Sequence, residues 1–238
     1  MEYRIEPKVG IVIVAGGKGN RMGSNTPKQF LFLGQAPILV QSINALSAAA
    51  RPAQIVVVLP EAHIDFWGNL ASRFEVAEHK VVTGGAERFD SVKAGIEALG
   101  EQIDIVAIHD AVRPLCSTEL IVRCVECAKQ KGSAIPVIEL SDSIRKVEGE
   151  GSQAIDRSTL RAVQTPQVFD STLIRRAYRQ AYSPTMTDDA SVVEAMGERV
   201  ELCQGERSNI KITTSEDLLY AQMLWEQRET EEDGRENI

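Results

Sequence analysis

The stretch VGIVIV, residues 9–14, followed at once by AGGKGNRMGSNTPKQF, residues 15–30, decides the fold. Its first part is an unbroken apolar and β-branched run, which is typical of a strand buried on both faces of a parallel sheet. Its second part places Lys18, Arg21 and Lys28 among glycines, which let a backbone approach a bound group closely. The stretch therefore predicts a strand that ends in a phosphate-binding loop, although a glycine-rich turn with solvated cations would read the same way.

The chain has 238 residues, 43% hydrophobic and 25% charged, which fits one globular α/β domain. Its net charge of −8, with no basic stripe, argues against a nucleic-acid partner, so local cations must hold any anionic ligand. The sequence has no apolar run of 18 residues and no apolar signal core near its start. We therefore expect a cytoplasmic protein with no membrane partner.

Four cysteines are too few and too scattered for a disulfide framework. Cys124 and Cys127 form a CxxC, but it lies inside a predicted helix, and no second pair could complete a zinc site. We interpret them as reduced cysteines of that helix.

Apolar runs alternate with amphipathic segments through the first half of the chain. The predicted strands are 9–14, 54–59, 80–82, 103–108 and 133–138, and the predicted helices are 37–50, 61–73, 87–99 and 117–131. This alternation predicts a Rossmann-like α/β fold: an open, mostly parallel, twisted sheet with helices on both faces.

The alternation stops after Ile138. Residues 139–164 alternate around Gly149 to Gly151 and are polar on both sides of the turn, which predicts a projecting β-hairpin arm. A two-stranded arm is marginally stable alone, so we expect it to pair with a second copy in a homodimer. The remaining predictions are helices 171–181, 188–196 and 215–227, strands 200–203 and 210–213, a single domain over 1–228, and a disordered acidic segment over 229–238.

Several polar loops are predicted to meet at one edge of the sheet, because ligands bind at the carboxyl ends of parallel strands. The loop after the first strand lacks the P-loop ending, and Met22 replaces the third glycine of the dinucleotide fingerprint, which argues against a nicotinamide oxidoreductase. The loop GGAERFDS, residues 84–91, precedes a helix start that attracts phosphate, although Asp90 or Ser91 could simply cap that helix.

Asp110, in HDAVRP, follows the fourth predicted strand. A carboxylate beside phosphate-binding loops is a natural Mg²⁺ ligand, and Arg113 could hold either a substrate phosphate or Asp110 itself. His109 next to Asp110 is compatible with a metal phosphohydrolase, but the other two histidines lie in unrelated segments. Lys211, in the last predicted strand, would bring a further cation to the same edge.

Six ordered motifs between residues 9 and 224 resemble those of the 2-C-methyl-D-erythritol 4-phosphate cytidylyltransferases, a family of nucleotidyltransferases. They are AGGKGNRMG…PKQF, GGxxRxxS, HDAxRP, QTPQxF, TDDAS and NIKxT. The resemblance implies cytidylyl transfer from CTP to methylerythritol phosphate, with release of pyrophosphate, on the non-mevalonate route to isoprenoid precursors. Ribitol-5-phosphate cytidylyltransferases share most of these motifs and are the alternative, and a non-catalytic nucleotide-binding protein would lack the cations or Asp110.

The resemblance also implies roles for individual residues. The implied nucleotide-binding residues are Ala15, Gly16, Gly17, Gly85, Ala86, Ser91 and Asp110, the last also serving a Mg²⁺ ion. The implied catalytic cations are Arg21 and Lys28 at the triphosphate, and Lys211 and Arg157 at the methylerythritol phosphate. The implied substrate-binding residues are Arg113, Ser143, Thr165 and Thr187, and Arg157 would come from the arm of a neighbouring subunit.

This chemistry needs cations rather than a general base. A phosphate monoester has its second pKa near ~6, so the attacking oxygen is already anionic at neutral pH. The obstacle is repulsion between that phosphate and the triphosphate, which the cations and Mg²⁺ would offset while stabilising the leaving pyrophosphate.

Overall fold

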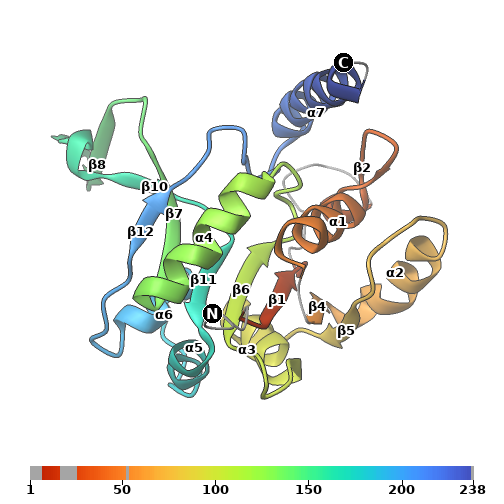
Figure 1. Cartoon of the computed structure of the whole chain (residues 1–238). Coiled ribbons are helices and arrows are strands. Elements are labelled where there is room, and N and C mark those ends of the chain that lie inside the picture. Colours follow the sequence, from red (N-terminus) through yellow and green to blue (C-terminus); the bar gives the residue numbers. More distant parts are fainter. Residues whose placement is uncertain (1–6, 17–25, 52–53, 237–238) are drawn as a thin grey trace, which may run out of the picture.

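The central sheet is parallel in one half and mixed in the other (Figure 1). The computed structural model describes residues 7–16, 26–51 and 54–236. The parallel half has the order β6-β1-β4-β5, made of β1 (Val9–Val14), β4 (Gln54–Leu59), β5 (Lys80–Thr83) and β6 (Ile105–Asp110). The predicted bounds of β1 and β4 are confirmed. The predicted strand 103–108 begins and ends two residues later, so Asp110 is the last residue of β6.

The other half contains antiparallel pairs that the sequence did not predict. Its strands are β7 (Ser133–Glu139), β10 (Arg161–Val163), β11 (Gln167–Asp170) and β12 (Leu202–Gln204). Strand β11 is antiparallel to both β6 and β7, β10 is antiparallel to β7, and β12 is parallel to β7. The sheet is thus mostly parallel, as predicted, with β11 inserted as a reversed strand.

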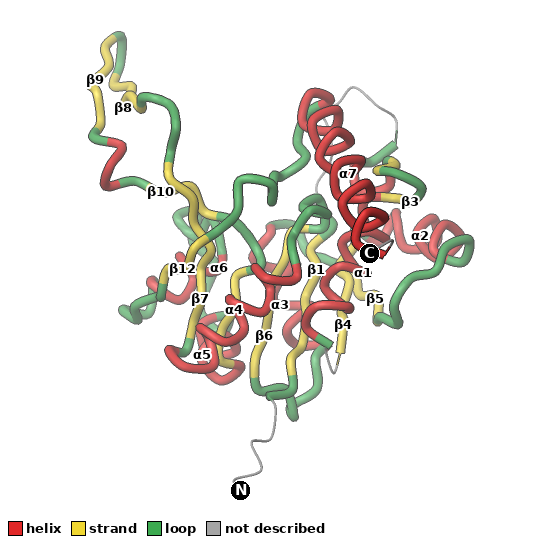
Figure 2. The backbone as a smooth tube through the Cα atoms, turned by 45° about the horizontal axis from the view of Figure 1, so that its top comes forward, coloured by secondary structure: helices red, strands yellow, loops and turns green. Residues whose placement is uncertain are grey.

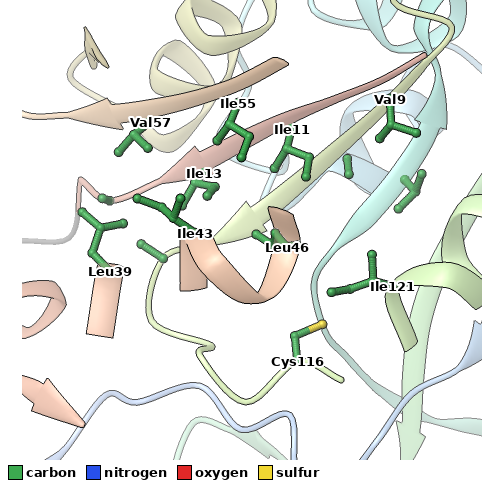
Figure 3. Packing of buried hydrophobic residues seen from close by; sticks show 14 of the residues in the cluster. Val9, Ile11, Ile13, Leu39, Ile43, Leu46, Ile55, Val57, Cys116 and Ile121 are labelled. Atoms are coloured by element: carbon green, nitrogen blue, oxygen red, sulfur yellow. The ribbon is translucent and has the colours of Figure 1, made fainter. Parts of the chain in front are cut away.

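Helices cover both faces of the sheet. Successive residues of β1 point to opposite sides, and both sets are apolar, so each face needs a covering layer. Ile11 and Ile13 lie in one core cluster, which Figure 3 shows with α1 residues, and Val12 lies in the other. The first cluster is covered by α1 (Ile38–Ala50), α2 (Ile64–Ala71), which follows the short η2 (Glu61–His63), and α4 (Thr118–Lys131). The second is covered by α3 (Arg88–Ala98), α5 (Ser171–Ala177) and α6 (Asp189–Glu194).

Helix α4 shows why its predicted bounds, 117–131, are correct to within one residue. The Ser117 side chain accepts a hydrogen bond from the Leu120 N–H at 3.0 Å and so caps the helix start. Gly132, with φ of 87°, ends the helix in the left-handed conformation that glycine adopts without strain.

The arm projects from the end of β7, as predicted (Figure 2). Its two-stranded sheet pairs β8 (Ile144–Glu148) with β9 (Gly151–Ile155) and is followed by η3 (Arg157–Thr159). Gly149 has a φ of 56°, which suits the hairpin turn.

The C-terminal segment differs from the sequence predictions in two places. Residues 210–213, which are all described, form no strand; instead the Ile212 N–H donates to the Val112 carbonyl, and Ile212 is buried beneath α7 (Ser215–Glu236). Helix α7 also runs beyond 227 through the acidic segment expected to be disordered. The physical reasons are the high helix propensity of Glu and Arg and the anchoring of α7 by Trp225 against Gly34, in the turn between β2 (Phe32–Leu33) and β3 (Ala36–Pro37).

None of the helices in the described part of the chain has both the length and the apolar character needed to cross a membrane.

Candidate active site

A cavity of about 260 Å³ opens at the carboxyl ends of β1, β5 and β6. Its lining residues are Val14, Ala15, Gly16, Lys28, Gln29, Gly85, Ala86, Glu87, Arg88, Ser91, Asp110, Val112 and Lys211. A larger cavity of about 520 Å³ lies at the amino ends of β4 and β5, around His79. Ligands of open α/β sheets bind at the carboxyl ends, so the smaller cavity is the candidate site.

Asp110 is the electrostatic centre of this cavity. Its carboxylate lies 2.9 Å from Lys211 Nζ, 3.6 Å from Arg113 Nε and 3.8 Å from Arg88 Nε. Burial raises the pKa of Asp110, but the charges of Arg88, Lys211 and Arg113 outweigh burial and hold the pKa well below its usual range. The group is therefore a fixed anion among three cations, and the predicted convergence of Asp110 and Lys211 is confirmed.

A buried hydrogen-bond chain fixes the end of β6. The Asp110 N–H donates to Thr165 Oγ1 at 3.0 Å, and Thr165 Oγ1 lies 3.2 Å from His109 Nδ1. His109 Nε2 lies 3.1 Å from the Arg113 carbonyl, so the neutral ring donates from Nε2 and accepts at Nδ1. Burial lowers the pKa of His109 to about 4, which keeps this tautomer neutral at physiological pH. Thr165, predicted to line the substrate site, uses its hydroxyl here.

Arg113 is 8% exposed and lies behind the cavity rather than in it. Its Nη1 donates to the Asn209 carbonyl at 2.8 Å, and its Nε faces Asp110. Of the two roles that the sequence left open, the structure favours holding Asp110. Asn209 in turn donates from Nδ2 to the Thr165 carbonyl at 2.9 Å, which links the Lys211 segment to the end of β6.

The loop before α3 forms one wall of the cavity. The Gly85 N–H donates to Ser91 Oγ at 3.2 Å, and a Cβ on Gly85 would lie 2.2 Å from the Cβ of Asp90, so this position requires glycine. Glu87 is the N-cap residue of the helix, and Asp90, one of the two caps that the sequence suggested, completes a capping box by accepting from the Glu87 N–H at 3.2 Å. Gly85, Ser91 and the first residue of α3, Arg88, thus belong to one wall of the cavity.

Sequence reasoning did not single out Arg88 and Asp189 as a pair. Arg88 donates from Nη1 and Nη2 to the two carboxylate oxygens of Asp189, both at 2.8 Å, and the Tyr178 hydroxyl donates to Asp189 at 2.6 Å. Asp189 is fully buried, so the bidentate pair holds Arg88 in the cavity wall beside Asp110. Both residues lie in quoted motifs, GGxxRxxS and TDDAS, but their separation of 101 residues hid the contact.

The opening loop contributes Ala15, Gly16 and Lys28, the last from η1 (Lys28–Phe30). Buried Gln29 donates from Nε2 to the Ala15 carbonyl at 2.9 Å and so ties the two ends of the loop together. Gly17 and Arg21, which the sequence also assigned to this site, lie outside the described residues.

Three predicted substrate residues are not brought to the cavity within one chain. Ser143 and Arg157 are exposed on the projecting arm, where Arg157 Nη1 donates to the Ser141 carbonyl. Thr187 is exposed in the loop that leads into α6. None of the three lines the cavity.

An open α/β sheet with glycine, lysine and a cation-bound aspartate at its carboxyl edge defines a nucleotidyltransferase-type site. The chain belongs to the 2-C-methyl-D-erythritol 4-phosphate cytidylyltransferase (IspD) family, whose model matches residues 9–227. A family member from Bacteroides thetaiotaomicron is 46% identical over 91% of this chain and 99% of its own length. The crystal structure of the enzyme of that name from Thermus thermophilus is 32% identical, with a TM-score of 0.74 over 92% of this chain and 99% of that chain. A third relative, 4-diphosphocytidyl-2C-methyl-D-erythritol synthase from Anaerococcus prevotii, has a TM-score of 0.79 at 25% identity, over 92% of this chain and 99% of that chain.

Proposed function

We propose that this chain transfers the cytidylyl group of CTP to 2-C-methyl-D-erythritol 4-phosphate. The products are 4-diphosphocytidyl-2-C-methyl-D-erythritol and pyrophosphate, and the step belongs to non-mevalonate isoprenoid precursor biosynthesis. Family membership over residues 9–227 carries this conclusion, together with the cation-lined cavity at the carboxyl edge of the sheet. The free thiols of the chain support a cytoplasmic location, which is part of the same proposal.

The reaction is an in-line attack of a substrate phosphate oxygen on the α-phosphorus of CTP. The bond that breaks joins the α-phosphorus to the bridging oxygen of the pyrophosphate leaving group. No base is needed, because the attacking phosphate is already anionic at neutral pH. Its approach to a triphosphate is opposed by charge repulsion, which Lys28 and Lys211, both lining the cavity, reduce.

The neighbouring residues have distinct supporting roles in this proposal. Backbone groups of Ala15 and Gly16 contact the nucleotide, and the Gly85–Ala86 backbone with Ser91 reads cytosine. Arg21 joins Lys28 at the triphosphate. Arg113 acts on the substrate through Asp110 and the Lys211 segment, since its guanidinium lies behind the cavity wall.

We include a Mg²⁺ ion that arrives with the nucleotide. In phosphoryl-transfer sites Mg²⁺ keeps several waters and takes one or two carboxylates plus substrate phosphates, and the ionised Asp110 fits that donor set. No group of three His, Cys, Asp or Glu side chains in residues 7–16, 26–51 and 54–236 could form an all-protein metal cage. When bound, the ion would neutralise charge on the nucleotide phosphates.

The proposal is completed by a homodimer in which the arm carries Arg157 to the cavity of the partner. Exposure of Arg157 on a projecting hairpin supports this arrangement, since an isolated two-stranded arm is marginally stable. Mixing an Arg157→Ala subunit with a Lys28→Ala subunit should restore activity, because some heterodimers then hold one intact site. Absence of any restored activity in mixtures shown to contain heterodimers would remove Arg157 from the partner's site.

The function is tested by pyrophosphate release in the presence of Mg²⁺. Each of the four nucleoside triphosphates is offered with methylerythritol 4-phosphate or ribitol 5-phosphate as acceptor. Release is expected with CTP and methylerythritol 4-phosphate only. Preference for ribitol 5-phosphate would retain the chemistry and reject the acceptor, whereas no release with either acceptor would reject the function.

A further inference from the structure

The seam between α4 and the edge strand β12 contains a cysteine pair that the proposed reaction does not use. Cys124 Sγ of α4 and Cys203 Sγ of β12 lie 3.5 Å apart, and the two residues are 79 positions apart in the chain. The two free thiols are within hydrogen-bonding distance, and their separation is about 1.5 Å longer than a disulfide bond. The seam itself is well fixed, since Arg123 donates from Nε to the Gln204 carbonyl at 3.0 Å and pairs with Glu206.

The two thiols differ in their access to solvent. Cys124 is 0% exposed and belongs to the main core cluster. Cys203 is half-buried and lines an open cavity of about 510 Å³ at the edge of the sheet, together with Arg161 and Arg207. A small oxidant can therefore reach Cys203 from the cavity, whereas Cys124 is buried beneath Cys203 and is not accessible.

The chemistry of the pair has the same asymmetry. The hydrogen bond from Cys124 lowers the pKa of the Cys203 thiol, and the charge of Arg123 acts in the same direction. The hydrogen bond to Cys203 and burial raise the pKa of Cys124. Since the thiolate is the reactive form, Cys203 is the better first nucleophile, and Cys124 keeps its proton until it attacks the oxidised Cys203.

We propose that Cys203 and Cys124 form a reversible intramolecular disulfide when the protein meets a peroxide, with Cys203 attacking first and Cys124 resolving. The Cys203 thiolate attacks one peroxide oxygen, the O–O bond breaks, and a sulfenic acid and water form. Cys124 sulfur then displaces the hydroxyl of the sulfenic acid, giving the disulfide and a second water. Two thiols lose two electrons and two protons, and one hydrogen peroxide becomes two waters; a dithiol reductant reverses the bond by exchange.

The disulfide should act as a staple on the fold and leave the active site intact. It links α4 to β12 across a seam that is already in contact, so the sulfur atoms need to close by only about 1.5 Å. Closing a loop of 79 positions restricts the unfolded chain, and we expect Tm to rise by roughly 5–15 °C. The kcat of the oxidised protein should stay within about twofold of the reduced protein, because Cys203 lies outside the candidate site.

The test uses the full-length reduced protein treated with a small excess of hydrogen peroxide in the presence of a chelator. Two of the four thiols are expected to disappear. Non-reducing tryptic mapping should join residues 124–129 to residues 200–207, and fragmentation distinguishes Cys124 from Cys127 within the first peptide. Dithiothreitol should restore all four thiols and the original Tm.

Cysteine variants distinguish a Cys124–Cys203 disulfide from oxidation at the other cysteines. Cys127→Ser and Cys116→Ser are the matched controls and should keep both the cross-link and the Tm shift. Cys203→Ser should lose the cross-link, and this variant stays informative even if Cys124→Ser fails to fold. A cross-link that joins Cys127 to Cys203, oxidation that stops at one modified thiol, or a Cys203→Ser protein that still loses two thiols would each overturn the proposal.

Discussion

Acidification from pH 7 to pH 5 should destabilise this protein through one buried group, His109. The ring is 0% exposed, and its hydrogen bonds to Thr165 and to the Arg113 carbonyl require a neutral imidazole. Burial lowers the pKa of His109 in the folded protein to about 4, from 6.5 in an unfolded chain. Between these two values the unfolded state binds the proton and the folded state does not, so stability falls as the pH decreases.

The size of the effect follows from the two pKa values. Integrating the proton linkage from pH 7 to pH 5 gives a loss of about 2 kcal/mol in the free energy of unfolding. Protonation of Asp110 does not contribute to the stability change between pH 7 and pH 5. Its folded pKa is depressed, so its contribution is present above the unfolded pKa near ~4 and is lost only below it.

The assay is urea unfolding followed by tryptophan fluorescence at pH 5, 6 and 7. His109→Gln and His109→Asn are compared with the wild-type protein, and His79→Gln removes a histidine elsewhere as the matched control. The wild type and His79→Gln should lose about 2 kcal/mol more than the His109 variants over this range. Equal pH dependence in the wild type and in both His109 variants would refute the assignment of His109 as a neutral buried ring.

Two further predictions concern the cavity wall. Lys28→Ala should lower kcat by about 10²–10³ with an unchanged circular dichroism spectrum, because Lys28 is placed to neutralise the triphosphate. In the same pyrophosphate assay Lys80→Ala, which changes an exposed lysine of β5, should stay near wild type. A Lys28→Ala kcat within threefold of wild type would exclude that role. Asp189→Asn removes the negative charge of the fully buried partner of Arg88 and should lower the free energy of unfolding, measured in urea, by about 3 kcal/mol. Asp65→Asn in α2 should change this free energy little. Equal urea midpoints for the two variants would contradict the stabilising role of the Arg88–Asp189 pair.

The parallel half of the fold could be predicted from the sequence because each of its elements carries a local signal. The runs 9–14 and 54–59 are apolar and rich in β-branched residues, which favours a buried strand. Ser117 marks the start of α4 by its capping side chain. Such signals depend on a few neighbouring residues and do not depend on contacts with distant parts of the chain.

The predicted strands 133–138 and 200–203 overlap β7 and β12, but the antiparallel pairs of the mixed half could not be predicted, because β10 and β11 are short and pair with strands distant in the sequence. Strands β10 and β11 have three and four residues and are separated by Pro166, so neither shows a clear alternation. Residues 210–213 do alternate, but their apolar side chains pack beneath α7 and find no strand to pair with among the described residues. Tertiary packing overrode local propensity at this segment.

The candidate site shows the same division. Asp110 and Lys211 were predicted to meet at the carboxyl edge of the sheet. They do meet, although Lys211 lies in no strand and its segment is held there by the hydrogen bond from the Ile212 N–H to the Val112 carbonyl. The Arg88–Asp189 pair was not predicted, since nothing local to either residue names its partner. The hydroxyl of Thr165, assigned to the substrate from the resemblance, already bonds to the Asp110 N–H and to His109 Nδ1. These contacts join residues 55 and 56 positions apart in the chain, so no local sequence pattern indicates them.

The central claim is that the cations lining the cavity carry the transfer step, and Lys211, which pairs with Asp110, tests it most directly. Lys211 Nζ lies 2.9 Å from Asp110, and its side chain is 44% exposed, so its ion pair contributes only about 1 kcal/mol or less to stability. Lys131, with Nζ 3.0 Å from Glu201 on the surface, offers an ion pair of the same geometry outside the cavity. The decisive measurement is kcat for pyrophosphate release by Lys211→Met and Lys131→Met with saturating CTP and methylerythritol 4-phosphate. We predict a loss of about 10²–10³ for Lys211→Met at nearly unchanged Tm and no more than about a twofold change for Lys131→Met; equal activity of the two variants would contradict the claim.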